Sequence, residues 1–426
     1  MPRAIELCAI AVLLITGMLS LRVVVLGDSA NSRLATAFSL VTHASWYIDD
    51  DGRDVPNPFE AGTVDKIERD GRMLSTKPPV LPLLMAAEYS VMRNVFGLEL
   101  NVREEARTIV RVMVLTLMLL PLCVGLLFFS STLTLLGAGP WMRVYLVAAL
   151  ALATSIPGFA GHINNHTPAA ALLCVAAWCA VSVLLKGSPT PWHLIGFGLA
   201  GGLVFTLDLP ETIYVAALGL PLLWRFPRQA VLWGGAGLAL PLGVHFVAMY
   251  ISTGSLLPVQ MHEDWYLYES AYWRNPGGVD ALNEPKGAYL FHMMLGRYGT
   301  FILFPVLGLG LVGAGMALAR SQKNLAAWAA IGGLAAFVVL TAYYVLKTNN
   351  YGGVAYGFRW HLASAPVLLM MSLPLLERVR KRWMIIPLLL VFGISAYSAW
   401  ECYQNPWSKD TEWTARLVYG PSVKGE

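Results

Sequence analysis

An aspartate follows the first long apolar run of the chain. Asp28 lies directly after the run 5–26 and before a helix-like segment, 34–41. A carboxylate just past a membrane helix lies at the membrane surface, where partial burial and neighbouring charges tune its pKa for accepting a proton from a reacting hydroxyl group. Asp is also a common N-cap of helices. Asp28 is therefore a candidate general base, with helix capping as the alternative.

A lysine precedes two prolines that begin the next helix-like segment. Because proline fixes φ and favours the first helical turn, Pro78 and Pro79 rigidify the backbone beside Lys77. The lysine lies where lipid phosphates are found, and an ammonium group binds a phosphate as a point charge. The alternative is an ordinary interfacial lysine that extends its charge to the headgroups. Lys77 is thus a candidate phosphate ligand.

A polar loop with three glycines, 349–361, runs directly into a late apolar segment. Glycine allows close approach of the backbone and unusual dihedral angles. Arg359 offers a planar fork that suits a phosphate or diphosphate. The loop is a candidate cradle for a lipid-linked phosphate, with Tyr351 and Tyr356 as further candidate substrate contacts. The alternative is a flexible hairpin whose Arg and Trp anchor the membrane interface.

A short polar turn, 162–166, begins another apolar segment. Asn165 and His166 either orient a substrate or cap the following helix, and capping is the simpler role for Asn165. His162 and His166 are four residues apart, as in some metal sites, but the Glu of the zinc-protease pattern is absent.

Two acidic segments complete the candidates. The run Asp49, Asp50 and Asp51 invites a divalent-metal interpretation, but its polar surroundings with Gly and Pro are typical of a solvated surface. Glu263 lies in the segment 261–266, which either closes over a site or is a plain surface loop. No cofactor is predicted from these patterns, although they leave room for a divalent metal.

The composition indicates that lipid is the solvent of this chain. Only 13% of its 426 residues are charged and 56% are hydrophobic, with a mean hydropathy of +0.58, whereas soluble domains average about 25% charged residues. The net charge of +4 is too small and too scattered to suggest nucleic acid as a partner. The five cysteines lie mostly in apolar segments and form no disulfide framework or zinc spacing.

The apolar runs predict an all-α polytopic membrane protein with about eleven transmembrane helices. One integral domain, 1–426, is the simplest division, and a run of about 20 apolar residues crosses a hydrocarbon core of about 30 Å. The predicted spans are 5–26, 108–129, 144–159, 167–185, 195–207, 212–224, 230–251, 298–319, 325–346, 362–376 and 384–400.

The distribution of Lys and Arg predicts the orientation, because short cytoplasmic loops attract them. With the N-terminus inside, every inner loop is basic, up to the cluster 378–382. This requires that 79–96 is an amphipathic helix in the outer interface and not a span. The outer segments are then 27–107, the turn 162–166, 253–297, 347–361 and the tail 401–426. All of the candidate residues lie in these outer segments or at their borders.

Four of these features, in this order, resemble the GT-C superfamily of integral-membrane glycosyltransferases. They are Asp28, the segment Lys77-Pro78-Pro79, the stretch 253–258 after a span, and Gly357-Phe358-Arg359 before a late span. The most similar branches are protein O-mannosyltransferases, the aminoarabinose transferases of lipid A, and family 39-like bacterial enzymes. The resemblance extends over 28–366.

The resemblance implies a GT-C-like bundle with juxtamembrane helices in its first outer loop. It implies transfer of a sugar from a polyprenyl-phosphate-linked donor to a lipid, glycan or protein acceptor, by inverting displacement at the periplasmic side of a bacterial inner membrane. Asp28 would be the catalytic base, while Lys77 and Arg359 would hold the donor phosphate, with Arg107 as a looser match. Relatives often carry a second acidic residue where this chain has Asn165 and His166.

The main alternative function is a membrane transporter or lipid flippase, because polar residues near membrane helices also mark substrate paths. Against it, the sequence contains no inverted repeat of the kind that many transporters show, and its charged candidates gather in outer loops. A non-catalytic assembly subunit is a second alternative, since the second acidic residue of the relatives is missing.

Overall fold

The computed structural model describes residues 2–20, 27–50 and 52–419. Within them the protein is all-α apart from one short antiparallel hairpin, in which β1 (Lys66–Arg69) pairs with β2 (Arg72–Ser75). The end of the first predicted span, Asp51 and the last residues of the tail lie outside the described residues.

The helices follow the apolar runs of the sequence. The longer ones are α1 (Pro2–Ser20), α2 (Asp28–Thr42), α3 (Val80–Phe96), α4 (Arg103–Val114), α5 (Leu120–Leu135), α6 (Pro140–Leu152), α8 (His166–Lys186), α9 (Pro191–Leu207), α10 (Thr212–Arg225), α12 (Gly235–Thr253), α15 (Pro305–Leu318), α16 (Leu325–Lys347) and α19 (Ile385–Gln404). The shorter ones are α7 (Ile156–Ala160), α11 (Pro227–Gln229), α13 (Lys286–Met294), α14 (Thr300–Leu303), α17 (Ala365–Met371), α18 (Leu373–Leu376) and α20 (Trp413–Tyr419).

In the described part of the chain, five helices are long and apolar enough to cross a membrane. They are Arg103–Leu135, His166–Lys186, Pro227–Thr253, Leu325–Lys347 and Arg382–Gln404, with 21 to 33 residues each. At 1.5 Å per residue, even the shortest covers a hydrocarbon core of about 30 Å. These helices indicate an integral membrane protein. The other predicted spans also form helices, but α6, α9 and α15 have only 10–17 residues.

Glycines allow the membrane helices to pack backbone against backbone. A Cβ atom on Gly198 of α9 would lie 1.9 Å from the carbonyl oxygen of Gly234, and one on Gly237 of α12 would lie 2.1 Å from that of Ile195. The same holds between α15 and α17, where a Cβ on Gly310 would lie 2.1 Å from a carbonyl oxygen. Small residues at such crossings are the usual means of association between helices in lipid.

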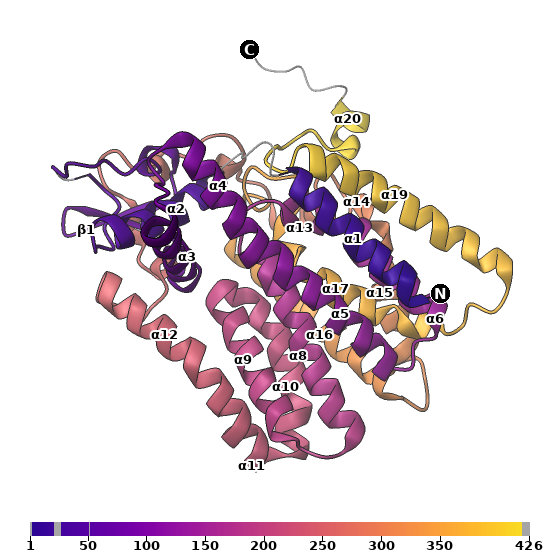
Figure 1. Cartoon of the computed structure of the whole chain (residues 1–426). Helices are drawn as coiled ribbons and strands as arrows, with labels where there is room; N and C mark the ends of the chain where they lie inside the picture. Colours follow the sequence, from indigo (N-terminus) through magenta and orange to yellow (C-terminus); the bar gives the residue numbers. More distant parts are fainter. Residues whose placement is uncertain (1, 21–26, 51, 420–426) are drawn as a thin grey trace.

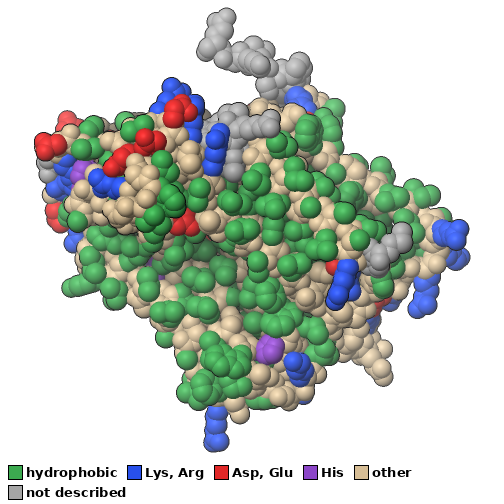
Figure 2. All heavy atoms as spheres, in the orientation of Figure 1, with side chains coloured by type: hydrophobic (Ala, Val, Ile, Leu, Met, Phe, Trp, Pro, Cys, Tyr) green, Lys and Arg blue, Asp and Glu red, His purple; other side chains and the backbone are tan. Residues whose placement is uncertain are grey.

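The first outer segment folds into a small lobe at one end of the bundle. Figure 1 shows α2, α3 and β1 together at this end and α11 at the opposite end. Helix α3 agrees with the helix predicted at 79–96, and its Tyr89 stacks on Phe38 of α2 with ring centroids 6.4 Å apart. In Figure 2 acidic side chains gather on this lobe, while hydrophobic side chains cover much of the helical bundle.

The basic loops predicted to be inside contact one another away from this lobe. Arg143, at the start of α6, pairs with Glu6 of α1 at 2.7 Å. The pair Arg320–Glu377, also at 2.7 Å, joins the segments that follow α15 and α18. The first pair joins two helices and the second joins two loops, and in each pair the partners are far apart in the sequence.

Candidate functional site

Asp28 is the first residue of α2 and connects this helix to the segment before the hairpin. Gly27 occupies the N-cap position, so the capping role considered for Asp28 is not observed. The carboxylate Oδ1 accepts a hydrogen bond from the backbone N–H of Val64 at 3.1 Å, and the backbone carbonyl accepts one from the Thr63 hydroxyl at 2.8 Å. The side chain is exposed. Asp28 therefore has a fixed backbone and a solvent-exposed carboxylate.

Lys77 forms an ion pair with Asp65 inside the lobe. The distance from Nζ to Oδ2 is 2.7 Å, and the side chains are only 17% and 18% exposed. The backbone of Asp65 is also fixed, because its carbonyl accepts hydrogen bonds from the Ser32 hydroxyl at 2.6 Å and from the Thr76 N–H at 3.1 Å. Burial lowers the pKa of Lys77, and the charge of Asp65 opposes that shift.

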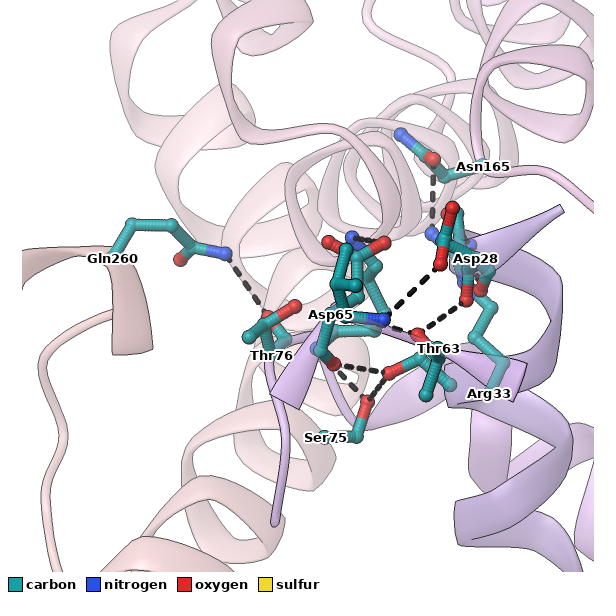
Figure 3. A network of polar contacts seen from close by, with 12 residues as sticks. Asp28, Arg33, Thr63, Asp65, Ser75, Thr76, Asn165 and Gln260 are labelled. Atoms are coloured by element: carbon teal, nitrogen blue, oxygen red, sulfur yellow. Dashed lines mark hydrogen bonds and ion pairs between the residues drawn. The ribbon is translucent and has the colours of Figure 1, made fainter. Parts of the chain in front are cut away.

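Two arginines lie close to this pair. Arg33 of α2 is 2% exposed and donates from Nη2 to Oδ1 of Asn165 at 2.9 Å. Figure 3 shows this contact beside Asp28, with the Asp65 network below it. Burial lowers the pKa of Arg33 to about 10 and also lowers that of Arg359, and in both cases Asp65 opposes the shift.

Asp65 pairs directly with Lys77, and its negative charge also acts on Arg33 and Arg359. This charge opposes the lowering of the pKa of all three cations by burial, while the two arginines add to the lowering of the pKa of Lys77. Within the described ranges, the buried Nε atoms of Arg33 and Arg359 have no hydrogen-bond partner. A buried donor without an acceptor costs about 1–3 kcal/mol. The cluster therefore has both the charge and the unused donors to bind an anion.

A histidine–aspartate pair lies next to the cluster. Nδ1 of His166 lies 2.5 Å from Oδ2 of Asp208, and both side chains are buried. Asn165 joins this pair to Arg33 and makes no capping hydrogen bond. Capping at this turn is instead performed by Asn164, whose side chain accepts from the Thr167 N–H at 2.8 Å. Asn165 thus occupies the N-cap position of α8, as one of its two interpretations expected, but its neighbour Asn164 supplies the capping hydrogen bond.

Arg33, Asp65 and Asp208 were not among the residues selected from the sequence. Asp208 lies in the turn between α9 and α10 and brings an acidic group to His166 from 42 residues further along the chain. Asp65 directly precedes β1, and the β1–β2 hairpin places it opposite Thr76, next to Lys77. The sequence analysis did not predict this hairpin. Arg33 had one available signal, its position on the same helix as Asp28.

The remaining candidates have other partners. Tyr351 and Tyr356 are buried and donate their hydroxyl groups to Glu284 and Glu401. Arg107 pairs with Glu104 on the half-exposed surface of α4 at 2.7 Å. Glu263 is exposed in the second outer segment. Five of the candidates therefore lie in one region: Asp28, Lys77, Arg359, Asn165 and His166. The other four, Tyr351, Tyr356, Arg107 and Glu263, have other partners or are exposed to solvent.

The described residues also bear on the metal interpretations. Asp49 pairs with Arg72 at 2.6 Å, and Asp50 accepts from the Asn57 N–H at 2.5 Å. These two carboxylates therefore stabilise the loop. Within the described ranges, the structure contains no group of three or more His, Cys, Asp or Glu side chains placed to hold a metal ion.

A partly enclosed cavity of about 200 Å³ adjoins the cluster. Lys77 contributes to its wall together with apolar side chains of α9 and α12, among them Phe205, Phe246 and Met249. Gln260 of the second outer segment closes over this region by donating to the Thr76 carbonyl at 3.0 Å. A cationic group and an apolar wall in one cavity suit an anion that is attached to a hydrocarbon chain.

No protein-family model matches this sequence, and a search of curated proteins gives no match. The resemblance to the GT-C superfamily therefore depends on the motifs, and the functional argument depends on the geometry of the site.

Proposed function

We propose that the chain is a GT-C-type glycosyltransferase of a bacterial inner membrane. It transfers a sugar from a polyprenyl-phosphate-linked donor to an acceptor hydroxyl group at the outer face. The observation that supports the proposal is the mostly buried Lys77–Asp65 ion pair, whose carboxylate also acts on the buried Arg33 and Arg359 and whose neighbour Val64 contacts the exposed Asp28.

The cationic cluster supports a phosphate ligand. Lys77, Arg33 and Arg359 are buried cations, and within the described residues the Nε atoms of the two arginines have no hydrogen-bond acceptor. Hydrogen bonds from ionised donors to phosphate are about twice as strong as neutral ones, and the guanidinium fork matches phosphate geometry. A donor phosphate would satisfy the unused N–H groups and compete with Asp65 for the ammonium group of Lys77.

The adjoining cavity supports a lipid-linked donor over a water-soluble one. Its wall places Phe205, Phe246 and Met249 beside Lys77. Burial of each methylene group contributes about 0.8 kcal/mol. A polyprenyl chain therefore gains affinity in this cavity while its phosphate reaches the cluster, whereas a free nucleotide sugar would gain nothing from the apolar wall.

Asp28 completes the reaction. An acceptor hydroxyl oxygen attacks the anomeric carbon, the bond between that carbon and the phosphate oxygen breaks, and Asp28 takes the hydroxyl proton. The polyprenyl phosphate leaves with the electron pair, and Lys77, Arg33 and Arg359 stabilise its added charge. One displacement inverts the anomeric configuration.

A native mass spectrum of the purified protein in mild detergent tests the proposal. We expect a co-purifying polyprenyl phosphate or its sugar conjugate in the wild type and none in the double variant Lys77→Ala/Arg359→Ala. A retained sugar would also identify the donor. If no lipid binds, even after addition of synthetic polyprenyl phosphate, the transferase proposal fails and a transporter becomes the better hypothesis.

A further inference from the structure

The C-terminal segment 405–416 wraps around the glycine-rich loop that carries Arg359. The carbonyl oxygen of Pro406 accepts a hydrogen bond from the Tyr356 N–H at 3.0 Å. The carboxylate of Glu412 accepts one from the Gly357 N–H at 2.8 Å. These hydrogen bonds join two segments about 50 residues apart. The tail therefore stabilises the loop.

Lys409 is the centre of this support. Its ammonium group donates to the carbonyl oxygens of Tyr351, Ala355 and Gly357 at 3.1, 2.9 and 2.8 Å. It also lies 4.4 Å from the ring centroid of Tyr298. An ammonium group has three N–H donors, so these three carbonyls use its full hydrogen-bonding capacity.

The loop needs such support because its backbone is unusual. Tyr351, Gly352, Gly353 and Gly357 all have positive φ, between 51° and 84°. For a non-glycine residue such as Tyr351 this conformation costs about 1–2 kcal/mol. The loop contains no regular strand or long helix, and three of its carbonyl groups converge on one point. Without a cation there, their partial negative charges would repel one another.

Trp407 extends the same segment to the candidate phosphate site. Its ring lies 5.5 Å from the guanidinium carbon of Arg359, within cation–π range. It also packs edge-on against Phe159, with ring centroids 5.3 Å apart. A Cβ atom on Gly27, which precedes Asp28, would lie 3.4 Å from the Trp407 ring. One tail residue thus contacts both Arg359 and the beginning of α2.

We infer that Lys409 is a positioning residue for the donor site, which holds the loop 351–359 in the conformation that presents Arg359 to a phosphate group. The identity of the ligand in this inference rests on the proposed function. The support of the loop by Lys409 rests only on the contacts of the tail. Lys409 acts through the loop backbone and touches neither sugar nor acceptor.

The variant Lys409→Met tests the inference, because methionine keeps an unbranched side chain but removes three donors. The first measurement is hydrogen–deuterium exchange of the peptide 351–361 in detergent. The second is the dissociation constant of synthetic polyprenyl phosphate. We expect faster exchange of the loop and about tenfold weaker binding, while Lys409→Arg, which keeps a cation with several donors, retains more of both properties.

Lys323→Met is the matched control. Lys323 also donates to a backbone carbonyl, that of Arg320 at 2.8 Å, but it lies in an inner loop. We expect wild-type loop exchange and lipid affinity in this variant. If Lys409→Met does not accumulate, Lys409→Gln removes the charge and keeps two N–H donors, so we expect a change in the same direction but smaller.

The outcomes separate the inference from the proposed function. If the wild type binds the lipid and Lys409→Met binds it equally well, the inference is overturned and the proposed function stands. If the wild type binds no polyprenyl phosphate, the proposed function is overturned. If hydrogen exchange of the loop is also unchanged in Lys409→Met, the support of the loop by Lys409 is overturned as well.

Discussion

Replacement of Lys77 by methionine tests the phosphate site most directly, because it removes one charge with little change in volume. In the free protein the variant loses the 2.7 Å pair with the mostly buried Asp65. Removal of one partner of a buried ion pair costs about 3–5 kcal/mol, so we expect a clear decrease in the free energy of unfolding. Donor binding loses a charge-assisted hydrogen bond of about 1.5–3 kcal/mol. At about 1.4 kcal/mol per factor of ten, the dissociation constant rises about tenfold to a hundredfold.

The assay is equilibrium binding of synthetic polyprenyl phosphate to the detergent-solubilised protein, with thermal melting as the measure of folding. Asp65→Asn is the matched control with the opposite expected sign. It removes the carboxylate that competes with phosphate for Lys77, so its dissociation constant falls below that of the wild type. A well-folded Lys77→Met variant that binds the lipid within about twofold of the wild type would refute the reasoning, given that about 1.4 kcal/mol corresponds to tenfold.

The other predictions concern the base, the buried pair and the packing of the bundle. Asp28→Asn abolishes sugar transfer in a turnover assay but leaves lipid affinity unchanged, because it removes a base without removing bulk. Asp208→Asn weakens the contact that orients His166 and lowers kcat by about tenfold, with a smaller effect on the dissociation constant of the lipid. Gly198→Ala places a Cβ atom 1.9 Å from the Gly234 carbonyl oxygen and lowers Tm, since overpacking costs about 1–3 kcal/mol.

The sequence was sufficient to predict elements that depend on local composition. The predicted spans 167–185 and 325–346 agree with helices His166–Lys186 and Leu325–Lys347, because a continuous apolar run in lipid must satisfy its backbone hydrogen bonds as a helix. The interfacial segment 79–96 is also a helix, Val80–Phe96. Proline marks its beginning, and Gly97 with φ of 69° marks its end.

The sequence was not sufficient to predict contacts between distant loops. Asn165 contacts Arg33 across 132 residues, and Lys409 contacts Gly357 across 52. No periodicity or motif at either position indicates its partner. Lys409 in the tail acts on backbone carbonyls of another loop, which side-chain patterns do not reveal. Asp208 was also missed, because it lies in the turn between α9 and α10, 42 residues from its partner His166.

The contacts of the two carboxylates in the first outer segment assign them different tasks. Asp65 is mostly buried and pairs with Lys77 at 2.7 Å, so protonation of its carboxylate would break an ion pair inside the lobe. Asp28 is exposed, and its Oδ1 accepts a backbone N–H at 3.1 Å. A base must be within reach of the acceptor and must take a proton without loss of structure. Under the proposed function, the exposed Asp28 is therefore the better candidate for the base, whereas the mostly buried Asp65 pairs with Lys77 in the protein without its ligand.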